Sequence, residues 1–282
     1  VGLERLQSGS ALVFLERAFP TELAPNRDRG VAVYSSLLEN RLSLELSGSN
    51  GTADGRDATN VEFDGEPEVN ARVFFEPVPG IGFGIAGTHG EKISDNDTRA
   101  ASTSNNQAFL PRYRSPAQTT IFNYVATATA DGEHSRITPQ AYAYVGPFGV
   151  MAEYIESAQE VGLGGRTEEF TNEAAQITAV WSITGEDQGF KGIKPTRPGG
   201  AWELALRWST LQIDDAAFDL KFADPTRSVE SADVWAVGLN WTITPNLKAF
   251  TNYTVTQFDG GAANGGDRDD EEAFFTRLQL NY

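Results

Sequence analysis

The last eleven residues, EAFFTRLQLNY, alternate between two kinds of side chain. In a strand such alternation places every second residue on the same face. One face would carry Phe274, Thr276, Leu278, Leu280 and Tyr282, and the other would carry Phe275, Arg277, Gln279 and Asn281. An apolar row that ends on an aromatic residue is typical of the strand that closes a membrane β-barrel. On this stretch alone, an ordinary sheet strand fits equally well.

The same period of two recurs along most of the chain after Arg29. No helix of ten or more residues competes with it, so the sequence predicts an all-β protein. Residues 1–25 differ, because their leucines and prolines indicate short helical or irregular turns. The thirteen predicted strands are residues 30–37, 41–48, 68–76, 81–88, 107–114, 119–127, 135–145, 148–157, 170–184, 201–212, 229–243, 247–257 and 273–282.

Several of these strands have one strongly apolar face bounded by tryptophan. Trp202 and Trp208 bound one such row, and Trp235 and Trp241 lie in another. A bilayer places large aromatic rings at its two interfaces, whereas a β-sandwich buries them in the middle of the row as often as at its ends. We therefore favour a transmembrane antiparallel barrel over a sandwich. The chain has no run of eighteen apolar residues, which excludes a transmembrane helix.

The composition excludes several kinds of chemistry. The chain has no cysteine and two histidines, so thiolate sites and multi-histidine metal sites are excluded. The net charge of -17 argues against nucleic-acid binding. His134 and Ser135 are neighbours and raise the alternative of a hydrolase, but a catalytic triad is assembled in space rather than in sequence. The acidic stretch DGGAANGGDRDDEE lacks the spacing of an EF-hand, so a solvated outer loop is preferred, with divalent ions able to bridge it to lipopolysaccharide. No cofactor and no metal are expected.

Loop lengths give an independent indication of a barrel. If the chain ends in the periplasm, short turns such as LLEN, PVPG, SPAQ and VGPF lie on the periplasmic side. Long acidic or glycine-rich loops then lie on the outer side, at residues 49–67, 89–106, 128–134, 158–169, 213–228 and 258–272. This asymmetry is what membrane barrels show. Residues 185–200 form a long periplasmic connection that breaks the pattern.

If the apolar rows face lipid, the opposite rows line the lumen and carry more basic than acidic residues. The inward basic set is Arg41, Arg72, Arg112, Arg114, Arg136, Arg207, Lys248 and Arg277, and the inward acids are Glu45, Glu68, Glu153 and Glu203. Rows of Arg and Lys select anions because they offer fixed donors and repel cations. Arg112 and Arg114 are two residues apart and share one face, and pairing with lumen acids is the structural alternative for them.

Ordered sequence blocks along the chain resemble the phosphate-selective porin O/P family. They are GLERLQSGSALVFLERAFP, LPRYRSPAQ, SRITPQAYAYVGPFGVMAEY, WSITGEDQGFKGIKPTRPGGAWELALRWS, SADVWAVGLNWTITPNLKAFTNYTVTQFDGG and FFTRLQLNY. The resemblance implies a sixteen-stranded barrel that forms a homotrimer in the outer membrane of a Gram-negative bacterium. Thirteen strands would then leave three that precede residue 1. The resemblance also implies that residues 1–27 are an inward-folded constriction segment containing Arg17, and that residues 28–282 are the barrel.

These observations lead to a functional hypothesis. The chain is expected to be a porin, not an enzyme, that passes small anions, phosphate or polyphosphate, through an arginine-lined lumen. Its surroundings would be outer-membrane lipids and lipopolysaccharide, and the barrel-assembly machinery would read Phe274, Leu278, Leu280 and Tyr282. The alternative is a barrel with little conductance that anchors partner proteins at the cell surface.

Overall fold

A computed structural model describes residues 1–55, 67–94 and 109–280 and shows eleven strands in one antiparallel sheet. Two further strands, β5 (Arg112–Arg114) and β6 (Thr120–Asn123), form a separate sheet. The large sheet contains β1 (Gly30–Leu37), β2 (Leu42–Ser49), β3 (Glu68–Val78), β4 (Ile81–Ile93), β7 (Thr129–Val145), β8 (Phe148–Leu163), β9 (Arg166–Ser182), β10 (Ala201–Gln212), β11 (Val229–Thr244), β12 (Leu247–Gly260) and β13 (Glu271–Leu280).

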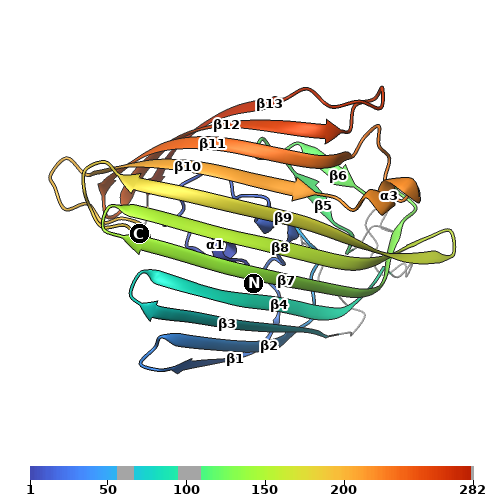
Figure 1. The fold of residues 1–282 in the computed structure, drawn as a ribbon, viewed down its shortest axis with the longest axis horizontal. Coiled ribbons are helices and arrows are strands. Elements are labelled where there is room, and N and C mark those ends of the chain that lie inside the picture. The colour runs from blue at the N-terminus through green and yellow to red at the C-terminus, as the bar shows by residue number, and fades with distance from the viewer. Residues whose placement is uncertain (56–66, 95–108, 281–282) are drawn as a thin grey trace.

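The strands of the large sheet follow one another in chain order, and β1 and β13 are its edge strands in the described residues. The sheet curves, and α1 (Leu3–Leu6), β5 and β6 lie behind it when its convex face is viewed (Figure 1). Two other short helices are α2 (Pro20–Leu23) and α3 (Asp215–Asp219). None of the helices in the described part of the chain is long and apolar enough to cross a membrane.

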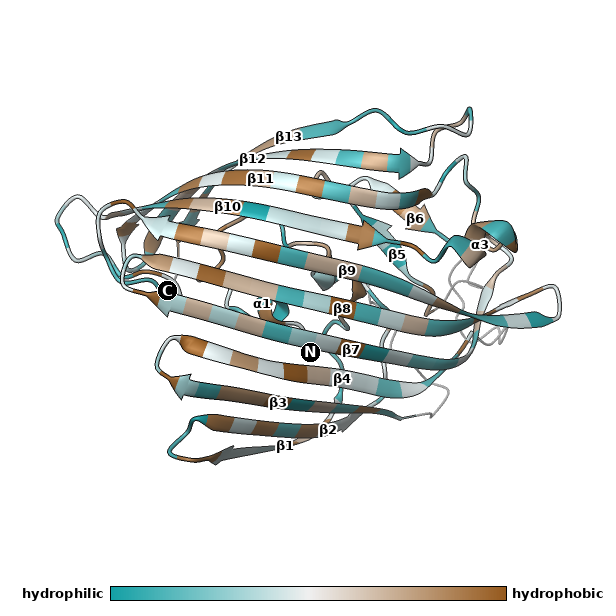
Figure 2. Ribbon diagram, in the orientation of Figure 1, coloured by the Kyte–Doolittle hydropathy of each residue, from teal (hydrophilic) through white to brown (hydrophobic). Residues whose placement is uncertain are grey.

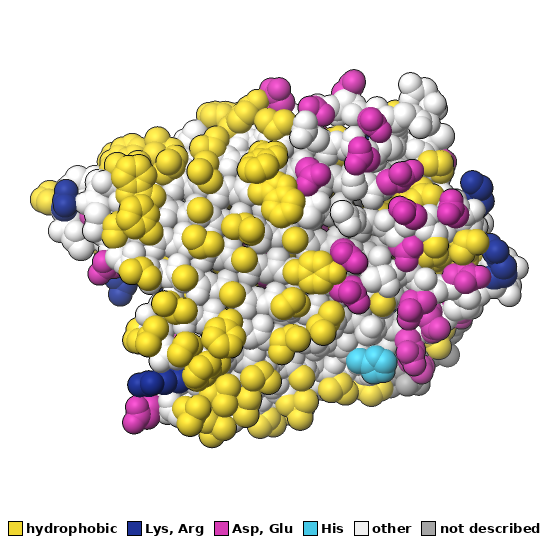
Figure 3. All heavy atoms as spheres, in the orientation of Figure 1, with side chains coloured by type: hydrophobic (Ala, Val, Ile, Leu, Met, Phe, Trp, Pro, Cys, Tyr) yellow, Lys and Arg dark blue, Asp and Glu magenta, His cyan; other side chains and the backbone are white. Residues whose placement is uncertain are grey.

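Burial along the strands confirms the predicted two-faced pattern. On β10, Glu203 and Arg207 are buried, whereas Trp202 and Leu206 are 36% and 53% exposed. Strand positions alternate between hydrophobic and hydrophilic residues (Figure 2). Hydrophobic side chains cover the convex face toward one end of the sheet, and acidic side chains gather toward the other end (Figure 3). The convex face therefore carries the apolar rows, and the concave face carries the polar rows.

Several predicted connections are wrong. Residues 107–127 were expected to supply two barrel strands, but the described part of this stretch forms the β5–β6 hairpin outside the large sheet. SPAQ is therefore the turn between β5 and β6 on the concave side of the large sheet, and it is not a periplasmic turn between two wall strands. Residues 128–134 and 158–169 were expected to be outer loops, but most of them extend β7, β8 and β9. Gly164 and Gly165 alone join β8 to β9, and their φ values of 62° and 83° suit a tight hairpin turn that favours glycine.

These corrections change the strand arithmetic. The described residues contain thirteen strands, as predicted, but only eleven of them belong to the large sheet. The prediction of three further strands counted all thirteen as wall strands. Because only eleven lie in the large sheet of the described residues, this count does not support the number three. β4 pairs directly with β7, and the two strands are antiparallel. Because the hairpin has two strands, leaving it out of the large sheet does not reverse the direction of any later strand.

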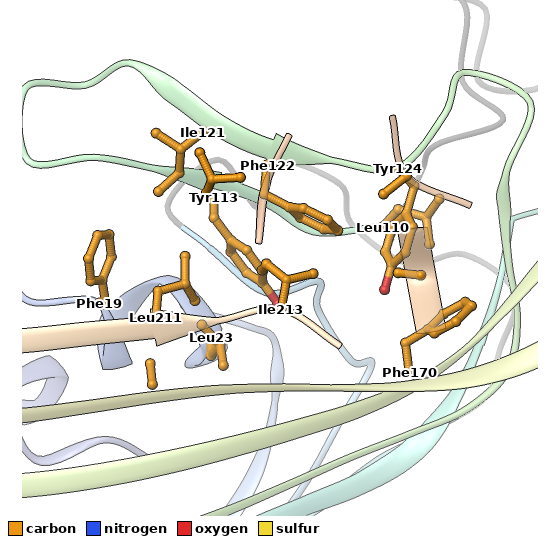
Figure 4. Close-up of a cluster of buried hydrophobic side chains, with 14 of the residues drawn as sticks. Phe19, Leu23, Leu110, Tyr113, Ile121, Phe122, Tyr124, Phe170, Leu211 and Ile213 are labelled. Atoms are coloured by element: carbon orange, nitrogen blue, oxygen red, sulfur yellow. The ribbon is translucent and has the colours of Figure 1, made fainter. Parts of the chain in front are cut away.

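The largest apolar cluster lies between the large sheet and the inward hairpin. Tyr113 and Phe122 of the hairpin stack with centroids 5.6 Å apart, and both are fully buried. Phe122 also packs edge-to-face on Tyr124 at 5.1 Å. Figure 4 shows the cluster, whose labelled members are Phe19, Leu23, Leu110, Tyr113, Ile121, Phe122, Tyr124, Phe170, Leu211 and Ile213. The hairpin is thus held by its own hydrophobic face.

Candidate functional site

The β5–β6 hairpin presents a basic face on the side opposite its buried aromatic residues. Arg112 and Arg114 flank the fully buried Tyr113, so strand alternation turns their side chains away from the core. Arg112 is exposed, and its Nε donates a hydrogen bond to Thr120 Oγ1 at 3.0 Å. Arg114 is half-buried. Arg112 has no salt bridge within the described residues.

Four oxygen acceptors from different parts of the chain hold this hairpin in place. Glu22 of α2 accepts from the Arg114 backbone N–H at 3.0 Å. Glu16 accepts from Gln118 at 2.8 Å, and Glu271 accepts from Thr119 at 2.7 Å. The Tyr113 hydroxyl donates to Asp54 at 3.0 Å. Burial and the Asp54 charge raise the pKa of Tyr113, which keeps its hydroxyl a donor.

Arg136 lies at the centre of a buried charge network. Its Nε donates to Asp54 Oδ1 at 2.6 Å, and its Nη1 donates to Glu68 Oε2 at 3.1 Å and to Thr88 Oγ1 at 2.9 Å. Its Nη2 donates to the Thr52 carbonyl at 2.8 Å. Burial would raise the pKa of Asp54, but Arg136 and His134 together, through charge and hydrogen bonds, lower it. Arg136 points inward as predicted, but its donors bind the protein itself.

Arg207 is the centre of a second buried network, which fixes residues 1–27 to the concave face. Its Nη2 donates to Glu4 Oε1, and its Nη1 donates to the Glu16 carbonyl at 2.9 Å. The guanidinium also lies 4.3 Å from the centre of the Phe14 ring. Glu153 accepts from the backbone N–H groups of Leu3 and Glu4. The segment that precedes β1 thus crosses the inner face of β8 to β12.

Lys248 is also covered by this segment. Its Nζ donates to the Leu12 carbonyl at 3.0 Å and lies 3.9 Å from Glu203. Arg277 on β13 lies 4.8 Å from the centre of the Phe250 ring and donates to Gln279 at 2.8 Å. Unlike Lys248, Arg277 is only half-buried. The structure therefore separates the inward basic residues into a covered set and a more accessible set.

The remaining predicted residues lie in three different environments. Arg17 is half-buried and donates to the Gln7 carbonyl at 3.1 Å, within the segment that crosses the concave face. Arg72 donates to Gln140 at 3.2 Å and lines a cleft of about 410 Å³ over β1 to β3. Arg41 was expected on an inward strand face, but it lies in the β1–β2 turn with 57% of its side chain exposed.

Sequence reasoning missed Glu4, Glu22 and Asp54, each of which is buried and holds an inward segment. They lie outside the predicted strands, so alternation could not assign them a direction. For Glu4 and Glu22, the only available signal was their position inside the segment that the resemblance implied to fold inward. Nothing in the local sequence marks Asp54, which lies in a stretch interpreted as an acidic outer loop.

The terminal strand and His134 can also be placed. Phe274, Leu278 and Leu280 are 67%, 68% and 69% exposed on the convex face, and Tyr282 lies outside the described residues. His134 is fully buried, and its Nε2 lies 2.9 Å from Ser157 Oγ rather than beside Ser135. The His134–Ser135 pair behind the hydrolase alternative is therefore not formed.

One end of the convex face is acidic (Figure 3). A cleft of about 770 Å³ lies there, and its carboxylates are Glu173, Asp214, Asp215, Glu230, Asp259 and Asp267. Within residues 1–55, 67–94 and 109–280, no group of three or more His, Asp or Glu side chains could hold a metal ion. Neither Arg112 nor Arg114 lines this cleft.

Two comparisons with known proteins bear on these observations. The family model described as phosphate-selective porin O and P matches residues 1–282. A search of curated proteins found no match.

Proposed function

The chain belongs to the phosphate-selective porin O and P family, and from this premise we propose that it is a passive, anion-preferring channel for phosphate or polyphosphate. Members of this family are porins of the outer membrane of Gram-negative bacteria. The large sheet is therefore part of the wall of a transmembrane β-barrel, and the chain is not an enzyme. The proposal concerns which solute crosses this barrel, and by which residues.

The observation that carries the proposal is the basic face of the inward hairpin. Arg112 is exposed, and Arg114 shares its face of β5. A planar guanidinium offers paired donors to phosphate oxygens, and its charge repels cations. Because the hairpin lies on the concave side of the wall, an anion crossing the lumen would pass these two residues.

The other inward basic residues divide by accessibility. Arg17, Arg72 and Arg277 are half-buried, and they would extend the positive potential along the wall. Arg136, Arg207 and Lys248 are at most 5% exposed and bind protein oxygens, so their role would be to position the inward segments. Arg41 would act only at the rim. The proposed anion pathway thus includes fewer residues than the full set of inward basic residues.

Reversal potentials across planar bilayers test the proposal. With a KCl gradient, the purified protein is expected to give a potential of the sign set by chloride permeation. Added phosphate should reduce the chloride current if phosphate binds in the same path. A potential of the opposite sign would contradict an anion-preferring channel, and an unchanged current in phosphate would contradict phosphate preference.

The packing of the concave face favours a second candidate, a structural barrel with little conductance. Residues 1–27 and the β5–β6 hairpin both pack against the wall, and the two segments contact each other where Gln118 donates to Glu16 at 2.8 Å. This candidate predicts negligible current in the bilayer experiment and a stable complex with a partner protein in a mild-detergent pull-down.

We also propose that the porin assembles as a homotrimer and that its terminal strand is read by the barrel-assembly machinery. The exposed row of Phe274, Leu278 and Leu280 supports the second point, because it presents a continuous apolar face. Chemical cross-linking in mild detergent should give a trimer band. Replacing Phe274 and Leu278 by Ser should lower the folded yield in the outer membrane more than the same changes at Val31 and Val33.

A further inference from the structure

The tip of the inward hairpin contacts a carboxylate that is held by a neutral donor. Glu271 Oε1 accepts a hydrogen bond from Thr119 Oγ1 at 2.7 Å. Glu271 Oε2 is buried and has no hydrogen-bond partner within the described residues. Arg268 also contacts the hairpin, because its Nη1 donates to the carbonyl of Thr120 at 3.3 Å. Glu271 is therefore placed beside the hairpin by contacts that leave its charge in place.

Three other inward carboxylates are held by cations instead. Asp54 and Glu68 both bind Arg136, and Glu4 binds Arg207. No salt bridge to Glu271 occurs within residues 1–55, 67–94 and 109–280. A cation cancels most of the field of a bound carboxylate, whereas a hydroxyl does not. Glu271 thus contributes negative potential that the paired acids do not.

Glu271 also lies close to the basic face. Thr119 binds Glu271, and the next residue, Thr120, accepts a hydrogen bond from Arg112 Nε. Two adjacent hairpin residues, Thr119 and Thr120, therefore link the Glu271 carboxylate to the exposed Arg112 guanidinium. An anion at Arg112 would experience both charges.

We propose that Glu271 is a specificity-determining residue that limits how strongly this pore prefers anions over cations. The proposal rests on the proposed function, since it assumes that solutes pass the hairpin. A unit charge several ångströms from the path, in a water-like dielectric, changes the local anion population on the order of threefold. Removing the charge should therefore increase the ratio of anion to cation permeability.

Three variants separate the charge of Glu271 from its hydrogen bond. Glu271→Gln keeps an oxygen acceptor for Thr119 and removes the charge. Thr119→Val removes the hydrogen bond and keeps the charge. Glu272→Gln is the matched control, because the next residue on β13 is exposed on the opposite face. Folding of each is checked by the heat-dependent shift in gel mobility, and Glu271→Asn serves as a second neutral variant if Glu271→Gln fails to fold.

The chloride-to-potassium permeability ratio, taken from reversal potentials, should rise on the order of tenfold for Glu271→Gln, because the loss of the negative charge raises the anion population and lowers the cation population by the same factor. The ratio should stay unchanged for Thr119→Val and Glu272→Gln. An unchanged ratio for Glu271→Gln overturns the proposal, and so does an equal rise for Thr119→Val, which would indicate a shift of the hairpin. A wild-type protein that prefers potassium contradicts the proposed function, while the change caused by Glu271→Gln still decides the role of Glu271. A wild-type protein without conductance overturns both.

Discussion

Arg136 and Arg114 both belong to the inward basic set, but they are surrounded differently. Arg136 is 3% exposed and bonded to Asp54, Glu68, Thr88 and Thr52, whereas the hairpin face shared by Arg112 and Arg114 is open at Arg112. A paired charge in a low-dielectric interior contributes to structure, and an unpaired charge at a water-filled surface contributes to selectivity. The number of inward arginines is therefore a poor measure of the potential of a pore.

Replacing Arg136 tests the structural half of this comparison and should have the largest effect on stability. Arg136→Met leaves Asp54 buried without its arginine, whereas Glu68 keeps Lys92 at 3.5 Å. The loss of the Arg136–Asp54 pair is expected to cost about 3–5 kcal/mol in the free energy of unfolding. Urea unfolding in liposomes, followed by tryptophan fluorescence, measures it. Arg41→Met is the control, because Arg41 is exposed and its loss should cost no more than about 0.5 kcal/mol. Equal midpoints for the two variants would show that the buried network is not required.

Glu4→Gln should have the next largest effect, because it removes the charge that binds Arg207. A hydrogen bond to a charged group contributes about 1.5–3 kcal/mol, so a loss of this size is expected. The residues around α1 should also leave the concave face more often and raise the single-channel conductance. Bilayer recordings measure this, with Glu39→Gln in the exposed β1–β2 turn as the control. A conductance equal to that of the control would mean that Glu4 does not hold the segment.

Protonation of Asp54 at low pH should have a smaller effect on the stability of the protein. Although burial raises its pKa, Arg136 and His134 together lower it below the ordinary value. A depressed folded-state pKa gives stability that is fully present above the unfolded value of about 4 and is lost as the pH falls toward the folded value. At pH values below about 4, the urea midpoint of the wild type should therefore be lower than at neutral pH. Asp54→Asn should lower the midpoint at neutral pH and flatten this acid dependence, and an equally steep dependence in the variant would assign the acid effect to other carboxylates.

Strand alternation predicted which face of each wall strand is apolar, because that choice depends only on a period of two. It therefore placed Arg207 and Trp202 on opposite faces correctly. It could not show that Arg207 is covered, since Glu4 lies more than two hundred residues away and no local pattern links them.

The hairpin was misplaced for a related reason. Tyr113 alternates with Arg112 and Arg114 as it would in a lipid-facing strand, but its apolar ring packs on an internal cluster with Phe122. Period alone cannot distinguish burial against protein from burial against lipid. The strand lengths of three and four residues, too short to cross a bilayer, became visible only in the structure.

Reversing the charges of Arg112 and Arg114 tests the other half of the comparison and should have the smallest effect on stability. Because Arg112 is exposed, Arg112→Glu with Arg114→Glu should change the urea midpoint far less than Arg136→Met does. The same double variant should reduce or reverse the preference for chloride over potassium, since two positive charges on one face become negative. Replacing both by Gln should give an intermediate permeability ratio, as expected if charge rather than shape sets it. An unchanged ratio in both double variants would place the hairpin face off the ion path, and the exposed Arg112 would then have no more to do with permeation than the buried arginines.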